Sequence, residues 1–274
     1  MGNLIDIINK NQALRKLYDY LELGLNTLWQ NNLLSHLKSF KVEGDVLTKE
    51  YIQRFILQVK DDMSSNNYSR RDVFEMSNVL SIYGQTAIAV QSEIVSDKDI
   101  EPSWAAKYFD CIKNISNQEM QTLWSKILLQ ELKQPNTYFI RTLDVFQRAD
   151  KFEIDWFFEI TKFVFDKACV PEFILTDNKF YQFNKFQTLV DAGFVNASLG
   201  TLSYPETATI RLVSADMKID ILNPPFGISI YTLTDAGTQI FDLNCGGATD
   251  EYIEKLKEVI ENGNRAKVLS VNRK

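Results

Sequence analysis

The most regular alternation of hydrophobic and polar residues lies between Ser116 and Pro135. Ser116 and Glu119 have the spacing of a capping box, so we expect a helix to begin there. Pro135 ends that helix because proline has no N–H to donate. A second helix is predicted after the proline, capped by Asn136 or Thr137. The first helix has one apolar stripe with a period of about 3.6 residues, formed by Met120, Leu123, Trp124, Ile127 and Leu128.

Glu131 continues this apolar stripe, because it follows Met120 by about three helical turns. A buried carboxylate needs a partner, since burying it alone is costly. Arg141 is the nearest cation on the second helix, and the short turn folds the two helices back on each other. The pattern therefore predicts an ion pair between Glu131 and Arg141. A structural clamp is favoured over a catalytic or ligand-binding carboxylate, because buried pairs more often fix geometry than perform chemistry.

The same segment carries a family resemblance. The matching residues are Ile115-Ser116-Asn117, Glu119-Met120-Gln121, Leu123-Trp124-Ser125-Lys126-Ile127-Leu128, Glu131, Pro135 and Arg141-Thr142-Leu143. This run resembles the signature of an uncharacterised bacterial family, catalogued as domain of unknown function 2806. The likeness is dense from Trp104 to Phe163. The family has Gly after the Pro and Ser before Arg-Thr-Leu, where this chain has Asn136 and Phe139-Ile140. The resemblance implies a shared helical core and a C-terminal segment of similar layout, and it implies no activity.

The pattern up to residue 170 is helical. Residues 4–40 form apolar stripes with a break near Gly24, and further helices are predicted over 48–63 and 70–95. Gly84 inside the last of these costs about 1 kcal/mol relative to Ala, so we expect another helix to approach closely there. Asp150 and Glu153 cap a helix rich in aromatic residues that are typical of a core. Residues 1–170 are therefore predicted to be a helical domain.

From residue 171 onward the period changes to two. Strands are predicted over 208–213, 217–222 and 226–233, after a helix over 179–192 that ends at Gly193. Another helix begins at Thr234. This order resembles a winged-helix module. The predicted fold class is α+β and mostly α, a helical bundle over 1–170 followed by a winged-helix-like module with a short antiparallel sheet over 171–274.

A DNA-reading module of this kind would place its 179–192 helix in the major groove. That helix offers only Lys179 and Lys185, beside Asp191, and the net charge of the chain is −6. Affinity for DNA comes largely from neutralising phosphates. Lys179 and Lys185 are therefore candidate nucleic-acid contacts, but protein contact is favoured over DNA binding.

The other candidates for chemistry are isolated residues. His36 is the only histidine and is expected at the surface. Cys245 precedes two glycines, which is more typical of a helix end than of a nucleophile without a base. Asp216, Lys218 and Asp220 alternate as on a solvent-facing strand, although the group faintly resembles a metal-dependent nuclease site. We predict no catalytic set, no metal site and no cofactor.

The three cysteines are scattered, which fits reduced thiols. No signal peptide and no stretch of 18 apolar residues stands out, so the expected location is the cytoplasm, without a membrane partner. The leading hypothesis is a non-catalytic regulatory or accessory subunit that contacts another protein or a second copy of itself. The alternatives are a nucleic-acid-associated regulator and, more weakly, a carboxylate-dependent enzyme or toxin built on Glu131.

Overall fold

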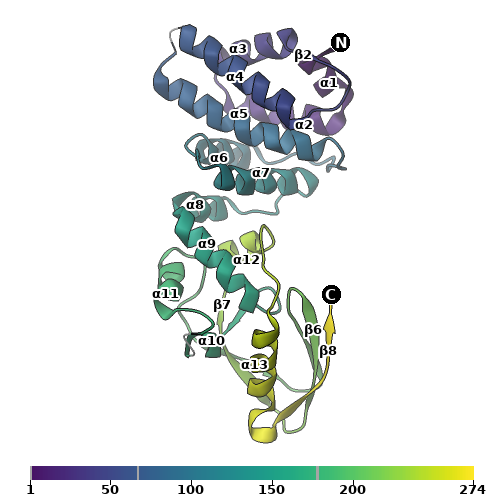
Figure 1. Ribbon diagram of the computed structural model, residues 1–274, viewed down its shortest axis with the longest axis vertical. Coiled ribbons are helices and arrows are strands. Elements are labelled where there is room, and N and C mark those ends of the chain that lie inside the picture. The colour runs from purple at the N-terminus through teal and green to yellow at the C-terminus, as the bar shows by residue number, and fades with distance from the viewer. Residues whose placement is uncertain (1, 67, 177–178) are drawn as a thin grey trace. The chain divides into compact units, whose positions relative to one another are not determined.

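The chain forms two compact units, Met1–Gln147 and Arg148–Lys274. The computed structural model describes residues 2–66, 68–176 and 179–274 (Figure 1). The boundary lies earlier than the one predicted after residue 170, because the aromatic helix belongs to the second unit. The ring of Phe157 lies 5.0 Å from that of Phe194, and the hydroxyl of Tyr181 donates to the carbonyl of Trp156 at 2.9 Å.

The N-terminal unit is helical, with one short pair of two-residue strands. Its elements are β1 (Gly2–Asn3), α1 (Leu4–Lys10), α2 (Gln12–Gly24), α3 (Thr27–Ser39), β2 (Lys41–Val42), α4 (Lys49–Ser65), α5 (Arg70–Val90), α6 (Pro102–Ile112), α7 (Gln118–Lys133) and α8 (Ile140–Arg148). The break predicted near Gly24 is confirmed between α2 and α3. A further break at Asn11 was not predicted. The side chain of Asn11 accepts a hydrogen bond from the N–H of Leu14 at 3.1 Å and so starts α2.

Helices α4 and α5 lie side by side (Figure 1). Gly84 makes this possible: a Cβ at that position would lie 2.3 Å from Cγ2 of Ile52 on α4. The predicted close approach at Gly84 is therefore confirmed. The loss of helix propensity at this glycine is offset by the contact that it permits between the two helices.

Aromatic side chains pack where α6 meets α7. The ring of Tyr108 lies 5.1 Å from that of Trp104 and 5.6 Å from that of Trp124. Trp124 in turn lies 5.2 Å from Phe146 on α8. All four side chains are buried. The periodic apolar stripe of residues 120–128 thus faces this core, as the sequence pattern predicts.

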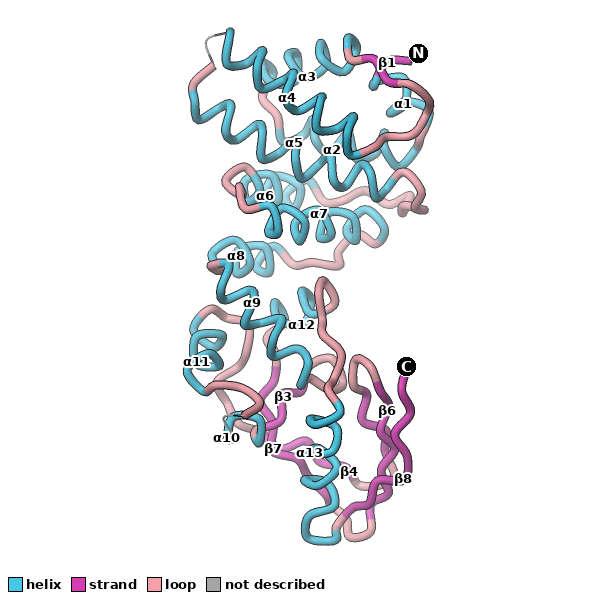
Figure 2. The backbone as a smooth tube through the Cα atoms, in the orientation of Figure 1, coloured by secondary structure: helices cyan, strands magenta, loops and turns pink. Residues whose placement is uncertain are grey.

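The C-terminal unit combines helices with two three-stranded antiparallel sheets, ordered β3-β7-β4 and β5-β6-β8 (Figure 2). Its elements are α9 (Lys151–Ile160), a 3-10 turn (Thr161–Phe163), β3 (Cys169–Pro171), α10 (Phe173–Thr176), α11 (Phe183–Asp191), β4 (Gly200–Tyr204), β5 (Ala208–Arg211), β6 (Ala215–Ile221), β7 (Phe226–Thr232), α12 (Asp235–Phe241), α13 (Asp250–Glu261), a second 3-10 turn (Asn262–Asn264) and β8 (Ala266–Arg273). The three predicted strands are confirmed. The fold class is α+β and mostly α.

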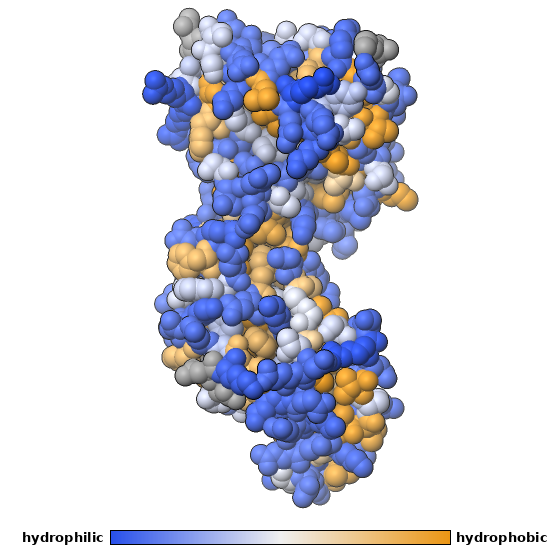
Figure 3. Space-filling view, viewed as in Figure 1, coloured by the Kyte–Doolittle hydropathy of each residue, from blue (hydrophilic) through white to orange (hydrophobic). Residues whose placement is uncertain are grey.

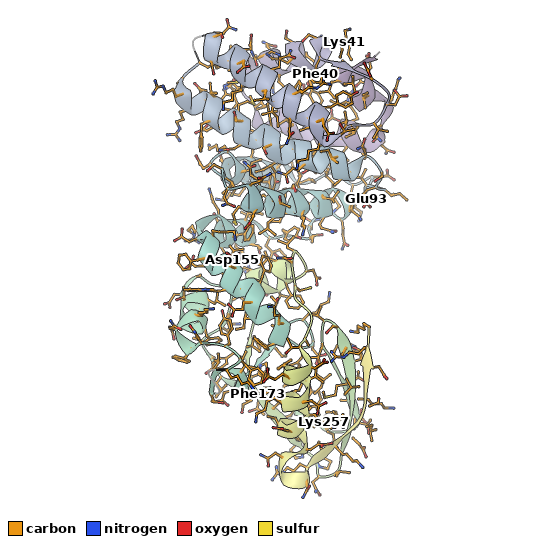
Figure 4. All side chains as sticks on the ribbon, in the orientation of Figure 1. Phe40, Lys41, Glu93, Asp155, Phe173 and Lys257 are labelled. Atoms are coloured by element: carbon orange, nitrogen blue, oxygen red, sulfur yellow. The ribbon has the colours of Figure 1, made fainter. Side chains whose placement is uncertain are left out.

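The sheet β5-β6-β8 has one buried and one exposed face. Met217 and Ile219 of β6 are buried, whereas Lys218 between them is exposed. Helix α13 packs against β8, and its Tyr252 is fully buried and stacks on Phe173, which Figure 4 labels on α10. Alternation along the strand therefore separates a hydrophobic core from a solvated face.

The outer surface of each unit is mostly hydrophilic on the face that Figure 3 shows, with separate hydrophobic patches. Large exposed apolar side chains among the described residues include Leu57 and Phe74 in the N-terminal unit and Phe183 and Leu269 in the C-terminal unit. Single exposed apolar residues are normal on protein surfaces. Such a residue indicates a binding surface only when the neighbouring residues on the same element support that interpretation.

Candidate functional site

Glu131 is the one fully buried carboxylate on the apolar stripe of α7, with a relative exposure of 1%. The helix carries it near its C-terminal end, two residues before Lys133. A short turn follows and leads to α8 at Ile140. The predicted burial of Glu131 is confirmed. The partner of its charge lies in that turn.

Three consecutive backbone N–H groups of the turn donate to the Glu131 carboxylate. The N–H of Asn136 donates to Oε1 at 2.5 Å, and those of Thr137 and Tyr138 donate to Oε2 at 3.1 Å each. Asn136 has a φ of 71°, the left-handed conformation that favours Gly and tolerates Asn. Successive N–H groups that converge in this way form an anion-binding concavity. The turn therefore wraps around the end of the buried side chain.

Trp104 of α6 fixes the same turn from another side. Its indole N–H donates to the carbonyl of Tyr138 at 2.9 Å, and both side chains are buried. Tyr138 is thus held at its N–H by Glu131 and at its carbonyl by Trp104. The sequence pattern marks Trp104 only as the start of the family likeness and predicts no contact for it. The indole N–H of a buried tryptophan usually has a hydrogen-bond partner. That tendency was the signal in the sequence that could have pointed to this contact.

The predicted ion pair between Glu131 and Arg141 is wrong in its partner. Arg141 is exposed, and its guanidinium carbon lies 5.0 Å from the centre of the Phe139 ring. Glu131 is compensated by main-chain donors instead. Because a backbone N–H carries a partial positive charge and is already fixed in the turn, it serves a buried carboxylate without the need to desolvate a second full charge.

Burial raises the pKa of Glu131, and the three backbone hydrogen bonds oppose that shift. An ionised carboxylate has about four acceptor positions. Three of them are used by the turn, which leaves little capacity for a substrate or a metal ion. The arrangement holds the α7–α8 turn and is unsuited to acid–base catalysis on a bound molecule.

The start of α7 also differs from the prediction in one residue. The side chain of Asn117 accepts from the N–H groups of Glu119 and Met120 at 3.0 and 3.1 Å. Asn117, and not Ser116, is therefore the N-cap. Both residue types are good caps, and the choice between neighbouring positions depends on the incoming chain direction.

The helix expected over 179–192 begins later, at Phe183. Lys179 precedes it and forms an ion pair with Glu251 of α13. Lys185 lies on the helix, 2.7 Å from Glu159 of α9, and its side chain is 20% exposed. Its Nζ also lies 5.6 Å from the centre of the Trp156 ring. Both candidate phosphate contacts are thus engaged by carboxylates of the same unit.

The exposed face of α11 is neutral to acidic. Phe183 at its first position is 54% exposed, and its ring lies 6.3 Å from the buried ring of Phe186 beneath it. Asn184, Gln187 and Asp191 are the other exposed residues of the helix. This face offers an aromatic side chain and amides, with no cation left for a phosphate.

His36 is buried, so the predicted surface position is wrong. Its Nε2 lies 3.2 Å from the carboxylate of Asp62 on α4, and its Nδ1 lies 3.3 Å from the amide of Gln58. Asn32 also donates to Asp62 at 2.9 Å. Hydrogen bonds from Asn32 and His36 lower the pKa of the Asp62 carboxyl. This cluster joins α3 to α4.

The cysteines show no activated thiol. Burial raises the pKa of Cys111 to about 12 and that of Cys169 to about 11. Burial also raises the pKa of Cys245, with the Asp242 carboxylate adding to the shift. A nucleophilic cysteine needs a lowered pKa. None of the three fits that role.

The acidic residues of β6 have ordinary structural partners. Asp216 pairs with Lys274 at 2.7 Å, and Asp220 accepts from the hydroxyl of Thr207 at 2.9 Å. Within the described residues there is no group of three or more His, Cys, Asp or Glu side chains that could hold a metal ion. Among the same residues, no helix has the length and apolar character needed to cross a bilayer.

Comparison with known proteins gives one result for the segment that contains Glu131. The family model described as "Protein of unknown function (DUF2806)" matches residues 68–175, which confirms the predicted resemblance. No curated protein and no solved structure shows a significant match. Residues 68–175, with the Glu131 turn at their centre, are therefore a match to the DUF2806 family.

Proposed function

We propose that the protein is a non-catalytic accessory or regulatory subunit that binds a protein partner through the exposed face of α11. The observation that carries this proposal is the composition of that face. Phe183 is exposed at the start of α11, whereas Lys185 forms an ion pair with Glu159. Exposed aromatic side chains are enriched at protein interfaces, whereas nucleic-acid surfaces need free cations.

We also propose that the C-terminal unit is a winged-helix-like module. Its support is the order of elements: helix α9, strand β3, helices α10 and α11, then β4 and β7 in one sheet with β3. Strands β5 and β6 are inserted between β4 and β7 and belong to the other sheet, where β6 pairs with both β5 and β8. In such a module the surface of α11 is the one that reads a partner.

A cytoplasmic location is part of the same proposal. Cys111, Cys169 and Cys245 form no disulfide. Secreted domains of oxidising compartments use cysteines as pairs, whereas reduced thiols are typical of the cytosol. The partner is either another protein or a second copy of this chain.

Nucleic acid is the second candidate partner. Arg265 and Lys267 are exposed at the start of β8, and the ion pairs of the described residues do not include them. The neighbouring cations Arg273 and Lys274 are paired with Asp250 and Asp216. Together with Lys218 of β6, which is also exposed and outside those ion pairs, these cations account for a small part of the phosphate contacts that a typical DNA-binding protein makes. Protein contact is therefore preferred.

The test uses the full chain and two matched variants. Phe183→Ser removes the exposed ring on α11. Phe74→Ser removes a ring of similar exposure on α5 of the other unit. Partners captured from native cells are identified, purified and titrated against each protein, and self-association is measured by sedimentation.

The proposal predicts that Phe183→Ser weakens binding by about tenfold or more, as for an interface hot spot. Phe74→Ser leaves binding unchanged. Equal binding by all three proteins contradicts the assignment to α11. If the captured material is nucleic acid that nuclease treatment removes, and no protein partner is recovered, nucleic acid replaces protein as the preferred partner.

A further inference from the structure

Side chains of the N-terminal unit line an apolar cavity of about 70 Å³. Five helices, α1 to α5, and the loop after β2 supply its walls. Its lining consists of aliphatic and aromatic side chains, most of them buried leucines. The leucines are Leu4, Leu14, Leu17, Leu21, Leu33, Leu37, Leu47 and Leu80.

The lining of the cavity offers few polar atoms to a water molecule. Of the lining side chains only Tyr18 and Tyr83 carry a polar atom. The hydroxyl of Tyr18 donates to Glu22 at 2.7 Å, and Glu22 is not part of the wall. A buried water needs two to four polar partners, and the wall supplies little beyond the hydroxyl of Tyr83, so the space is poorly suited to hold water.

The volume of the cavity exceeds that of the small voids that are common in protein interiors. A single water needs roughly 10–15 Å³ of probe-occupied volume, and native interiors contain few voids above that size. The cavity is several times larger. Its walls also resist collapse: Ile52 already touches Gly84, with no room for even a Cβ. Phe55 packs edge-on against Phe40, labelled in Figure 4, with ring centres 5.4 Å apart.

We propose that this cavity is a binding site for a small non-polar molecule without hydrogen-bonding groups, of the size of xenon or a short hydrocarbon. A guest restores the van der Waals contacts that the empty walls lack. An engineered leucine-lined cavity of about 150 Å³ in another protein takes benzene or xenon. At about half that size, this cavity admits the smaller guest and excludes the larger. The site is independent of the α11 surface.

The test is methyl NMR of the full chain under increasing xenon pressure. The expected result is a saturable shift of the methyl signals of Leu17, Leu33 and Leu37, with distant methyls such as those of Leu269 unchanged. Ala87 lines the cavity and is half-buried. Ala87→Val fills the space from one wall, and it should weaken xenon binding by about tenfold or more, because the added methyl groups displace the guest.

A second variant tests the size limit. Leu33→Ala enlarges the cavity and should let benzene bind, whereas the unmodified protein should not bind it. Absence of a saturable xenon shift in the unmodified protein overturns the proposal. Equal xenon affinity in Ala87→Val also overturns it, and so does the failure of a folded Leu33→Ala protein to admit benzene.

Discussion

The carboxylate of Glu131 accepts the backbone N–H of Tyr138 at 3.1 Å, seven residues along the chain. The carbonyl of the same residue is held by Trp104. Tyr138 is therefore the point where α6, α7 and the start of α8 are tied together. The tie uses one buried charge and no counter-ion, and it lies inside the segment that matches the DUF2806 family.

A double-mutant cycle separates this arrangement from an ion pair. Glu131→Gln keeps the shape of the side chain but turns an amide donor towards N–H groups, and it should cost about 1–3 kcal/mol of unfolding free energy. Arg141→Ala should add its own cost independently, because the donors to the Glu131 carboxylate are main-chain N–H groups of the turn. The coupling energy from urea unfolding is expected to be within about 0.5 kcal/mol of zero. A coupling of several kcal/mol would restore the ion pair.

The pH dependence of stability should carry the signature of a buried acid. Burial raises the pKa of Glu131 in the folded state. The folded protein therefore binds the proton more tightly than the unfolded chain does. The contribution of Glu131 to the unfolding free energy is then greatest below the unfolded pKa and falls as pH rises through the folded pKa.

The measurement is unfolding free energy against pH for the unmodified protein and for Glu131→Gln. The difference between the two curves should follow that fall. Asp62 provides the contrast, since its folded pKa is lowered. Its contribution should be present above the unfolded pKa and should be lost as pH falls. A Glu131 curve that follows the Asp62 direction would show that the hydrogen bonds outweigh burial.

Gly84→Ala tests the contact between α4 and α5. Alanine is the better helix former by about 1 kcal/mol, yet its Cβ would overlap Cγ2 of Ile52. Ile52 is β-branched and stiff, so overpacking should prevail and cost about 1–3 kcal/mol. Ile52→Ala in the same protein should recover part of that loss. Thermal unfolding of the three proteins shows whether Gly84→Ala raises or lowers the stability. A stabilised Gly84→Ala protein would contradict the close contact between Gly84 and Ile52.

Lys185→Met tests the structural role of the cation on α11. The ammonium group pairs with Glu159 and lies near the rings of Trp156 and Tyr181. Because Glu159 is 40% exposed, the expected cost is modest, about 0.5–1 kcal/mol. Affinity for duplex DNA should not change. A loss of DNA affinity with unchanged stability would assign Lys185 to phosphate contact.

The sequence predicted those features that depend on periodicity. The 3.6-residue stripe placed Glu131 inside, and the period of two located β5, β6 and β7. It could not identify the partner of Glu131, because pattern analysis compares side chains and the donors are main-chain N–H groups of a turn. The left-handed residue Asn136 shapes that turn.

Other errors have local causes. His36 follows Leu33 by three positions, so the helical period places it on the buried face of α3. It was expected at the surface because histidine is a polar residue. Lys179 lies outside α11 because the chain before the helix is held by Tyr181, whose hydroxyl donates to α9. Capping and tertiary hydrogen bonds decide such boundaries, and hydrophobic periodicity does not contain them.

Hydrogen exchange at the turn amides tests the central claim most directly. The N–H groups of Asn136, Thr137 and Tyr138 are followed in the unmodified protein and in Glu131→Gln, with buried amides of β6 as an internal reference. The account predicts strong protection of all three amides and its joint loss in the variant, while β6 is unaffected. Rapid exchange of these amides in the unmodified protein, or protection that survives Glu131→Gln, would contradict a carboxylate that holds the turn.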